Sequence, residues 1–278
     1  MAVPPSTPPD TGTPDAHRGW HGSGLGTQVL VLTARSLRAL RKNRQLIVFS
    51  LIQPLVSVTL FSQVFGSLTR LPGFPPGVSY LDFLLPAVLV TTAMSSGTAS
   101  GSALIFDIKQ GVVARFRSMP IHLASVLIAR SLTNLIRTTL QLLITLLVAT
   151  VLFGFRAAGG GSGVLGAILL ALAISYGISW TFLAIGLWTA DAETLQTITA
   201  IVLPPLTYSS SAYVPLAFLP GWMQALAAVN PVTYAVGGAR GLTLGMPVTS
   251  TVLIALTTSA VIAVAAATLA IRDFGHAI

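Results

Sequence analysis

The sequence contains no cysteine and only two lysines, and these shortages exclude several kinds of chemistry. Without cysteine, neither a disulfide framework nor a thiolate metal site can form. Lys42 and Lys109 lack the preceding glycines and the following Ser or Thr of a Walker phosphate-binding loop. The chain therefore does not hydrolyse ATP by that route. It also lacks an H-E-x-x-H motif and a serine flanked by the glycines of a nucleophile elbow.

Charge is scarce as well. Only 8% of the 278 residues are charged, 53% are apolar and the mean hydropathy is +0.83, whereas roughly a quarter of an ordinary soluble domain is charged. The seven acidic residues lie in the N-terminal tail, at the ends of apolar runs and near the C-terminus, so paired-carboxylate chemistry is hard to build and a lipid-modifying enzyme is disfavoured. No apolar run contains the acid that a proton-driven or sodium-driven transporter needs near mid-membrane.

Long apolar runs predict an all-α integral membrane protein. A helix of about 20 apolar residues crosses the hydrocarbon core. Six stretches meet or approach that length, namely residues 45–69, 83–106, 138–155, 164–188, 194–214 and 250–271. The third continues as helix down to about residue 122, and we expect its lower turns to leave the lipid or to face protein.

Residues 214–239 are too apolar for an aqueous loop, because they hold several prolines and no charge. We predict two short half-helices that dip into the outer leaflet and return, since broken backbone at that depth must pack on protein or line a wet cavity. The residues assigned to this outer re-entrant gate are Pro215, Pro220, Trp222, Asn230 and Pro231.

The basic residues near the span ends predict the orientation of the chain. Nine Lys and Arg residues flank one side of the predicted membrane and three flank the other, so the positive-inside rule places both termini in the cytoplasm. The net charge of +8 gathers at these membrane faces, where anionic lipids explain it better than nucleic acid does.

Two segments precede the first span. Residues 1–26 are rich in Pro, Gly, Ser and Thr and predict a disordered cytoplasmic tail without a cleavable signal peptide. Residues 27–278 form the predicted transmembrane domain. At its start, residues 27–42 place Val29, Leu32 and Ser36 on one helical arc and Arg35 and Arg38 on the other, which predicts an amphipathic helix in the cytoplasmic interface with its basic face toward anionic lipids.

A short basic segment lies between the second and third spans. Because Phe116 and Met119 would otherwise be exposed to water without purpose, we interpret the segment as a docking site for another protein. In the alternative interpretation Arg115 and Arg117 are only positive-inside anchors. The residues assigned to docking are Gly111, Arg115, Phe116, Arg117, Ser118, Met119 and Pro120.

Polar residues inside the spans form a second group of candidates. Gly97 and Gly101 predict close helix packing of the second span, and its hydroxyls can bond across helices or line a substrate route. In the third span, Arg137 belongs to a stripe at spacings of four, three and four that faces either a vestibule or the interface, whereas the interface is preferred for Arg130. The candidates for a pathway or dimer face are Thr91, Ser95, Thr98, Ser102, Arg137, Thr207 and Tyr208.

The order of these features resembles the type-2 permease family of ATP-binding-cassette (ABC) transporters, and especially the daunorubicin-resistance branch. The resemblance spans residues 27–275 and rests on R-F-R-S-M-P-I at 115–121 and on Pro215, Leu219, Pro220, Trp222, Asn230, Pro231 and Arg240. Family members often carry an acid just before the first arginine of the cytoplasmic motif, but this chain has Val113 and Ala114 there.

The resemblance implies a function. It implies an export permease of a bacterial cell membrane with no cofactor of its own, moving an amphiphilic drug-like molecule or lipid. It also implies that residues 106–120 form a coupling helix for two copies of a separate nucleotide-binding subunit, which binds ATP and Mg. The pathway would form with a second copy or a homologous permease. A non-transporting scaffold or sensor subunit is the alternative.

Overall fold

The computed structural model describes residues 25–42, 44–112 and 123–276, and these residues form helices and connecting turns without a strand. The elements are α1 (Leu25–Lys42), α2 (Arg44–Phe65), η1 (Gly66–Arg70), α3 (Tyr80–Lys109), α5 (Leu123–Phe153), α6 (Gly160–Thr189), α7 (Ala192–Tyr208), η2 (Leu216–Phe218), α8 (Gly221–Val229), α9 (Pro231–Leu244) and α10 (Thr249–His276). The predicted tail lies almost wholly outside the described residues.

Within the described ranges, five helices are long and apolar enough to cross a membrane: α3, α5, α6, most of α10, and α2 extended into η1. The expected sixth span corresponds to α7, which has 17 residues and ends at Tyr208 instead of continuing to residue 214. Pro204 and Pro205 lie in its last turn, and the chain then bends through Ser209 and Ser210. The prediction of an all-helical membrane protein is confirmed, while the count of six spans is not.

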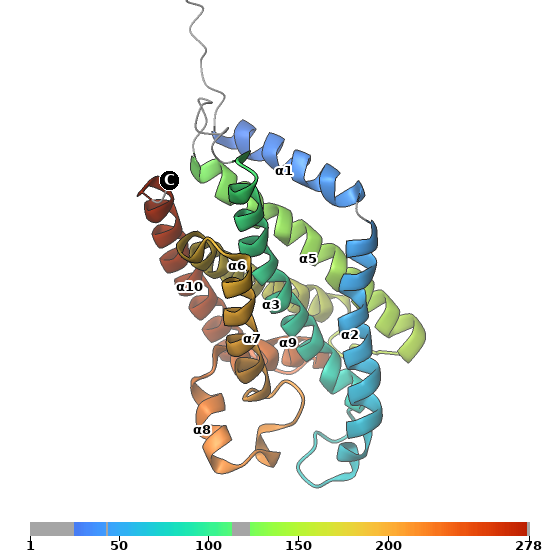
Figure 1. The fold of residues 1–278 in the computed structure, drawn as a ribbon. Helices are drawn as coiled ribbons and strands as arrows, with labels where there is room; N and C mark the ends of the chain where they lie inside the picture. The colour runs from blue at the N-terminus through green and yellow to red at the C-terminus, as the bar shows by residue number, and fades with distance from the viewer. Residues whose placement is uncertain (1–24, 43, 113–122, 277–278) are drawn as a thin grey trace, which may run out of the picture.

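The helices form a bundle around α3 and α6, which pack against each other along much of their length (Figure 1). In the membrane-spanning window, 78% of α3 is buried but only 11% of α2. Because α2 exposes Ile52, Val56 and Leu60 at every fourth position, its outward face needs lipid or another protein as a neighbour.

The two ends of the bundle differ in character. In Figure 1, α1 crosses one end of the bundle, and the C-terminus of α10 lies at the same end. We call it the basic end, because Arg35, Arg38, Lys109 and Arg272 lie there in exposed positions. The opposite end, called the loop end, carries η1, η2 and α8.

The predicted amphipathic helix is present as α1, which packs on α5. Thr33 is buried and Leu32 and Ser36 are partly buried, whereas Arg35 and Arg38 are exposed. The apolar arc thus faces the bundle and Arg38 faces away from it, as the periodicity indicated, while Arg35 lies at the edge and lines a pocket shared with α3 and α5.

Candidate functional site

A polar recess of about 150 Å³ lies between α2, α3 and α7. Its lining brings together four of the predicted pathway residues, Thr91, Ser95, Thr207 and Tyr208. Gln53 and Ser57 of α2 complete its polar wall, and Tyr213 lies on the loop that follows α7. We call this feature the hydroxyl recess. Residues more than 110 positions apart in the sequence thus share one polar site on an otherwise apolar bundle.

The hydroxyl recess continues along one face of α3. Thr91, Ser95, Thr98 and Ser102 recur at spacings of four, three and four and are all partly exposed. Residues at those spacings lie on one side of a helix, so they form a half-exposed polar stripe that runs from the recess toward the basic end.

The opposite face of α3 is buried against α5 and α6 through a second set of hydroxyls. The hydroxyl of Ser96 lies 2.7 Å from that of Thr138, and the hydroxyls of Ser100 and Ser179 are 2.5 Å apart. Gly97 permits this approach, because a Cβ there would lie 2.7 Å from the Ile178 side chain, and a Cβ on Gly101 would meet the backbone carbonyl of Phe182. Close packing at these glycines is confirmed, and one helix serves packing on one face while it presents hydroxyls on the other.

The predicted polar stripe of α5 contacts α3 and α2 at successive positions along the helix. Near the basic end Arg130 forms an ion pair with Asp107 of α3, which supports the structural interpretation of this arginine. The hydroxyl of Ser96 donates to the amide oxygen of Asn134 at 3.5 Å, and further along α5 the amide of Gln141 donates to the backbone carbonyl of Ser50 at 2.7 Å. Arg137 lies between these contacts, on α5 rather than in the lining of the hydroxyl recess.

A second ion pair ties the basic end of α3 to the start of α7. The Lys109 ammonium lies 3.2 Å from a carboxylate oxygen of Asp191. The other carboxylate oxygen of Asp191 caps α7 by accepting from the backbone N–H of Thr194 at 2.9 Å. These hydrogen bonds, that of Thr194 first and that of Lys109 second, lower the pKa of Asp191 to about 2. α3 is thereby linked near this end to both α5 and α7.

Of the predicted docking segment, the described part is Gly111. Its φ of +68° lies in the left-handed region, and its N–H donates to the carbonyl of Ile108 at 3.0 Å, so α3 ends there in a turn that favours glycine. The other candidates, Arg115, Phe116, Arg117, Ser118, Met119 and Pro120, lie outside the described residues. A pocket of about 170 Å³ between α1, α3 and α5 is lined by Asp107 and Arg130 and reaches Val112.

Two short helices, α8 and α9, occupy the interval for which two half-helices were predicted. Asn230 lies between them in the chain. Its amide oxygen caps α9 by accepting from Val232 N–H at 2.9 Å, and its amide nitrogen donates to the Leu206 carbonyl of α7 at 2.6 Å. Pro231 begins α9, Pro220 caps α8 and Pro215 precedes η2. Trp222 is 66% exposed, and Leu226 and Val229 are exposed on the same side of α8, so this helix presents an uncovered apolar face.

Arg240 of α9 holds the loop end together, although the sequence placed it only among the outer charges and motif residues. Its guanidinium donates to the carbonyls of Ser211 at 2.8 Å, Ala212 at 3.2 Å and Phe83 at 3.0 Å, and it stacks 3.5 Å from the centre of the Phe83 ring. The signal that could have identified it is a single arginine among the small residues of 237–241, where a long charged side chain can reach across neighbouring helices.

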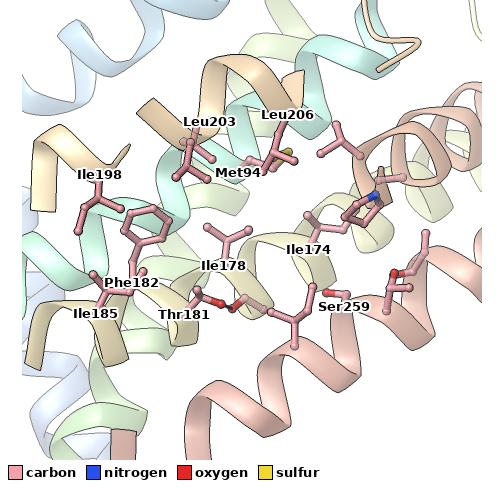
Figure 2. A pocket seen from close by; sticks show the side chains of 18 residues that line it. Met94, Ile174, Ile178, Thr181, Phe182, Ile185, Ile198, Leu203, Leu206 and Ser259 are labelled. Carbon is pink, nitrogen blue, oxygen red and sulfur yellow. Dashed lines mark hydrogen bonds between the residues drawn. The ribbon is translucent and has the colours of Figure 1, made fainter. Parts of the chain in front are cut away.

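An apolar cavity of about 210 Å³ opens on the other side of α7, between α7, α9 and α10, with α6 as its floor (Figure 2). Ile198, Leu203 and Leu206 approach it from α7, and Ser259 approaches from α10. The described residues contain no cluster of His, Cys, Asp and Glu that could hold a metal ion. Recess and cavity thus flank α7 on opposite sides, one polar and one apolar.

Comparison with known proteins identifies what kind of bundle carries these features. The sequence pattern of the ABC-2 type transporter family matches residues 27–244, which include α2, α3, α5, α6, α7 and the Asn230–Pro231 junction. The chain belongs to the ABC-2 type transporter family. It is therefore a membrane-embedded transport subunit, and the resemblance drawn from its sequence motifs is confirmed.

Relatives of this ABC-2 chain include permeases named for drug resistance. It is 33% identical over 195 residues to the daunorubicin resistance ABC transporter permease protein DrrB1 of Streptomyces coeruleorubidus, which covers 70% of this chain and 67% of the relative. It is 29% identical over 226 residues to the probable doxorubicin resistance ABC transporter permease protein DrrC of Mycobacterium tuberculosis, covering 80% and 79%. The putative transport permease ycf38 of Porphyra purpurea is 28% identical over 68% of this chain and 65% of its own length.

Proposed function

We propose that this chain is the permease subunit of an ATP-driven exporter, and that it moves an amphiphilic drug-like molecule or a lipid out of the cytoplasm or the inner leaflet. Two copies of a separate nucleotide-binding subunit bind ATP and Mg and hydrolyse the ATP. The basic end lies in the cytoplasm, which agrees with the positive-inside rule and puts both termini on that side. Names of drug-resistance relatives support this class of cargo.

The observation that carries the proposal is the hydroxyl recess with its stripe on α3. Hydroxyls that only stabilise a bundle are buried in contact with other helices, as Ser96 and Ser100 are, but Thr91, Ser95, Thr98 and Ser102 remain partly exposed. A second copy, or a homologous permease, placed against α2, α3 and α7 would enclose this polar surface and turn it into a path. The sparsely buried α2 supports a partner on that side.

In the same proposal α7 crosses the membrane as the sixth span, and the loop end completes the crossing. At 1.5 Å per residue its 17 residues extend about 26 Å, slightly less than the roughly 30 Å of hydrocarbon. α8 and α9 then dip into the outer leaflet as an outer re-entrant gate, with Trp222 at the membrane surface. The hydrogen bonds of Asn230 to α7 support a gate that follows the movement of that helix.

In the same proposal the segment that was expected to form a coupling helix over 106–120 docks on the nucleotide-binding subunit, although its first residues, 106–109, belong to the last turn of α3. In this arrangement Arg115 and Arg117 pair with acids of the subunit and Phe116 fills an apolar groove. The two ion pairs at the basic end of α3 would pass a displacement of this segment on to α5 and α7 as rigid bodies.

The test is co-purification of the chain with a separately encoded Walker-loop ATPase, combined with ATP-dependent transport in proteoliposomes. We expect Arg117→Glu and Phe116→Ala to weaken the complex and to reduce transport together. Arg156→Glu, an exposed arginine at the loop end, is the matched control and should leave complex formation unchanged. If both coupling variants bind the ATPase and transport as the wild type does, the coupling assignment is wrong.

A further inference from the structure

Among the described residues, Arg137 has no ion-pair partner. Its Nε atom is buried without a hydrogen bond, and the neighbouring amide nitrogen of Asn134 is likewise buried and unpaired, on a side chain that is only 6% exposed. No carboxylate in the described part of the chain lies within 4.0 Å of the guanidinium, and Asp107 is already paired with Arg130. Two buried donors about one helical turn apart on α5 therefore have no acceptor among the described residues.

The length of α5 places these donors near the inner boundary of the hydrocarbon. The 31 residues of α5 extend about 46 Å, so the helix projects well beyond a core of roughly 30 Å. If the core begins at Phe153, about 20 residues take it to residue 134 or so. Asn134 and Arg137 then lie just inside the boundary, and Arg130 with Asp107 lies outside it, where an ion pair is tolerated.

The polar residues of α5 also contact the two helices that line the hydroxyl recess. Asn134 is hydrogen-bonded to Ser96, whose neighbour in the sequence, Ser95, lines the recess. On the other side of Arg137, Gln141 bonds to Ser50 of α2, one helical turn before Gln53 of the recess lining. On α5, Arg137 thus lies between a contact to α3 and a contact to α2, the two helices that also line the recess.

An unpaired arginine and a free amide at such a depth are costly unless an anion completes them, because a desolvated charge needs an opposite charge or several hydrogen bonds. A guanidinium presents donors in a fork that fits a phosphate or carboxylate. We propose that Arg137 and Asn134 bind the anionic head group, a phosphate or carboxylate, of an amphiphile whose chains lie in the inner leaflet. Resting on the proposed function, this makes the cargo an anionic amphiphile and disfavours a cationic one.

The experiment uses the full chain in nanodiscs of phosphatidylcholine and three probes with the same fluorescent acyl tail, ending in a phosphate, a hydroxyl or an ammonium group. We expect the phosphate probe to bind at least about tenfold more tightly than the other two, as a charge-assisted hydrogen-bonded contact provides. Arg137→Gln should remove that preference, Arg137→Lys should retain part of it, and Asn134→Leu should weaken it severalfold. Arg156→Gln, the matched charge loss at the loop end, should change nothing.

Folding does not confuse the result, because Arg137→Gln removes an unpaired charge and should melt at or above the wild-type temperature. Equal binding of the three probes, or an unchanged phosphate preference in Arg137→Gln, would overturn the assignment. Two measurements distinguish a resident lipid from cargo. They are competition by phosphatidylglycerol and movement of the phosphate probe when the ATPase and ATP are added, since only cargo is moved. Phosphate-selective binding with no transport of any probe would refute the proposed function and uphold the anion site.

Discussion

Replacing Arg240 with methionine should loosen the loop end of the bundle, because this arginine hydrogen-bonds from α9 both to α3 and to the loop after α7. Its guanidinium binds the carbonyls of Ser211 and Ala212 after α7 and the carbonyl of Phe83 near the start of α3. Methionine preserves most of the apolar stem and removes the fork of donors. The variant therefore isolates the hydrogen bonds from the packing.

The expected loss of stability follows from the partners that are left behind. Ser211 and Ala212 are buried, and a buried carbonyl deprived of its donor costs about 1–3 kcal/mol. The contact of Arg240 with the Phe83 ring adds about 0.5–2 kcal/mol, while removal of a partly desolvated charge returns some of the total. We expect a net loss of roughly 2–4 kcal/mol, enough to lower the Tm by about 5 °C or more.

The assay is thermal unfolding in nanodiscs together with limited proteolysis of residues 209–220. Arg240→Lys should fall between wild type and Arg240→Met, because one ammonium group cannot reproduce a fork that reaches both α3 and the loop. Arg156→Met serves as the control, since its side chain is exposed at the same end. A wild-type Tm and no cleavage within residues 209–220 in Arg240→Met would refute this role of Arg240.

Three further outcomes are expected. Gly101→Ala should lower the Tm, because its Cβ meets the Phe182 backbone carbonyl, whereas Gly221→Ala, with open space around it, should not. Asp191→Ala should lower the Tm through loss of the α7 cap, while Asp191→Asn, which still caps, should mainly uncouple ATP hydrolysis from transport. Because the pKa of Asp191 is lowered to about 2, the stability that its carboxylate provides is complete above the ordinary pKa of an aspartate. That stability should be lost only as the pH falls from about 4 toward 2. Ser95→Leu should reduce transport without lowering the Tm, and a melting defect equal to the transport defect would contradict its place on the pathway.

Much of the fold could be predicted from the sequence because lipid removes most alternatives: an apolar run of sufficient length must form a helix. The limits of the helices were harder, and α7 shows why. The apolar run continues to residue 214, but Pro204 and Pro205 each remove a backbone donor, and the hydroxyls of the following serines offer competing partners, so the helix ends at Tyr208. Hydropathy reports how apolar a segment is and does not detect where the helical backbone hydrogen bonds end.

The candidate site divides in a similar way. The sequence indicated Thr91, Ser95, Thr98 and Ser102 as candidates for a pathway or dimer face, but it could not show that Thr207 and Tyr208 lie beside Thr91 and Ser95, because that depends on how α7 packs on α3. The role of Arg240 was missed for the same reason, since its partners are 28 to 157 positions away. Chemistry confined to one helix is visible in the sequence, whereas contacts between helices require the structure.

The position of α3 explains how one helix can take part in docking, packing and transport without conflict. Its buried face holds it to α5 and α6 through hydroxyls and two glycines, so it moves with them rather than past them. Its exposed stripe belongs to the hydroxyl recess, and its basic end is fastened to α7 by Lys109 and Asp191, immediately before Gly111 ends the helix. Under the proposed function, a push on the segment after Gly111 would reach both walls of the recess, α3 directly and α7 through Asp191. A transport step would then change the spacing between those two walls.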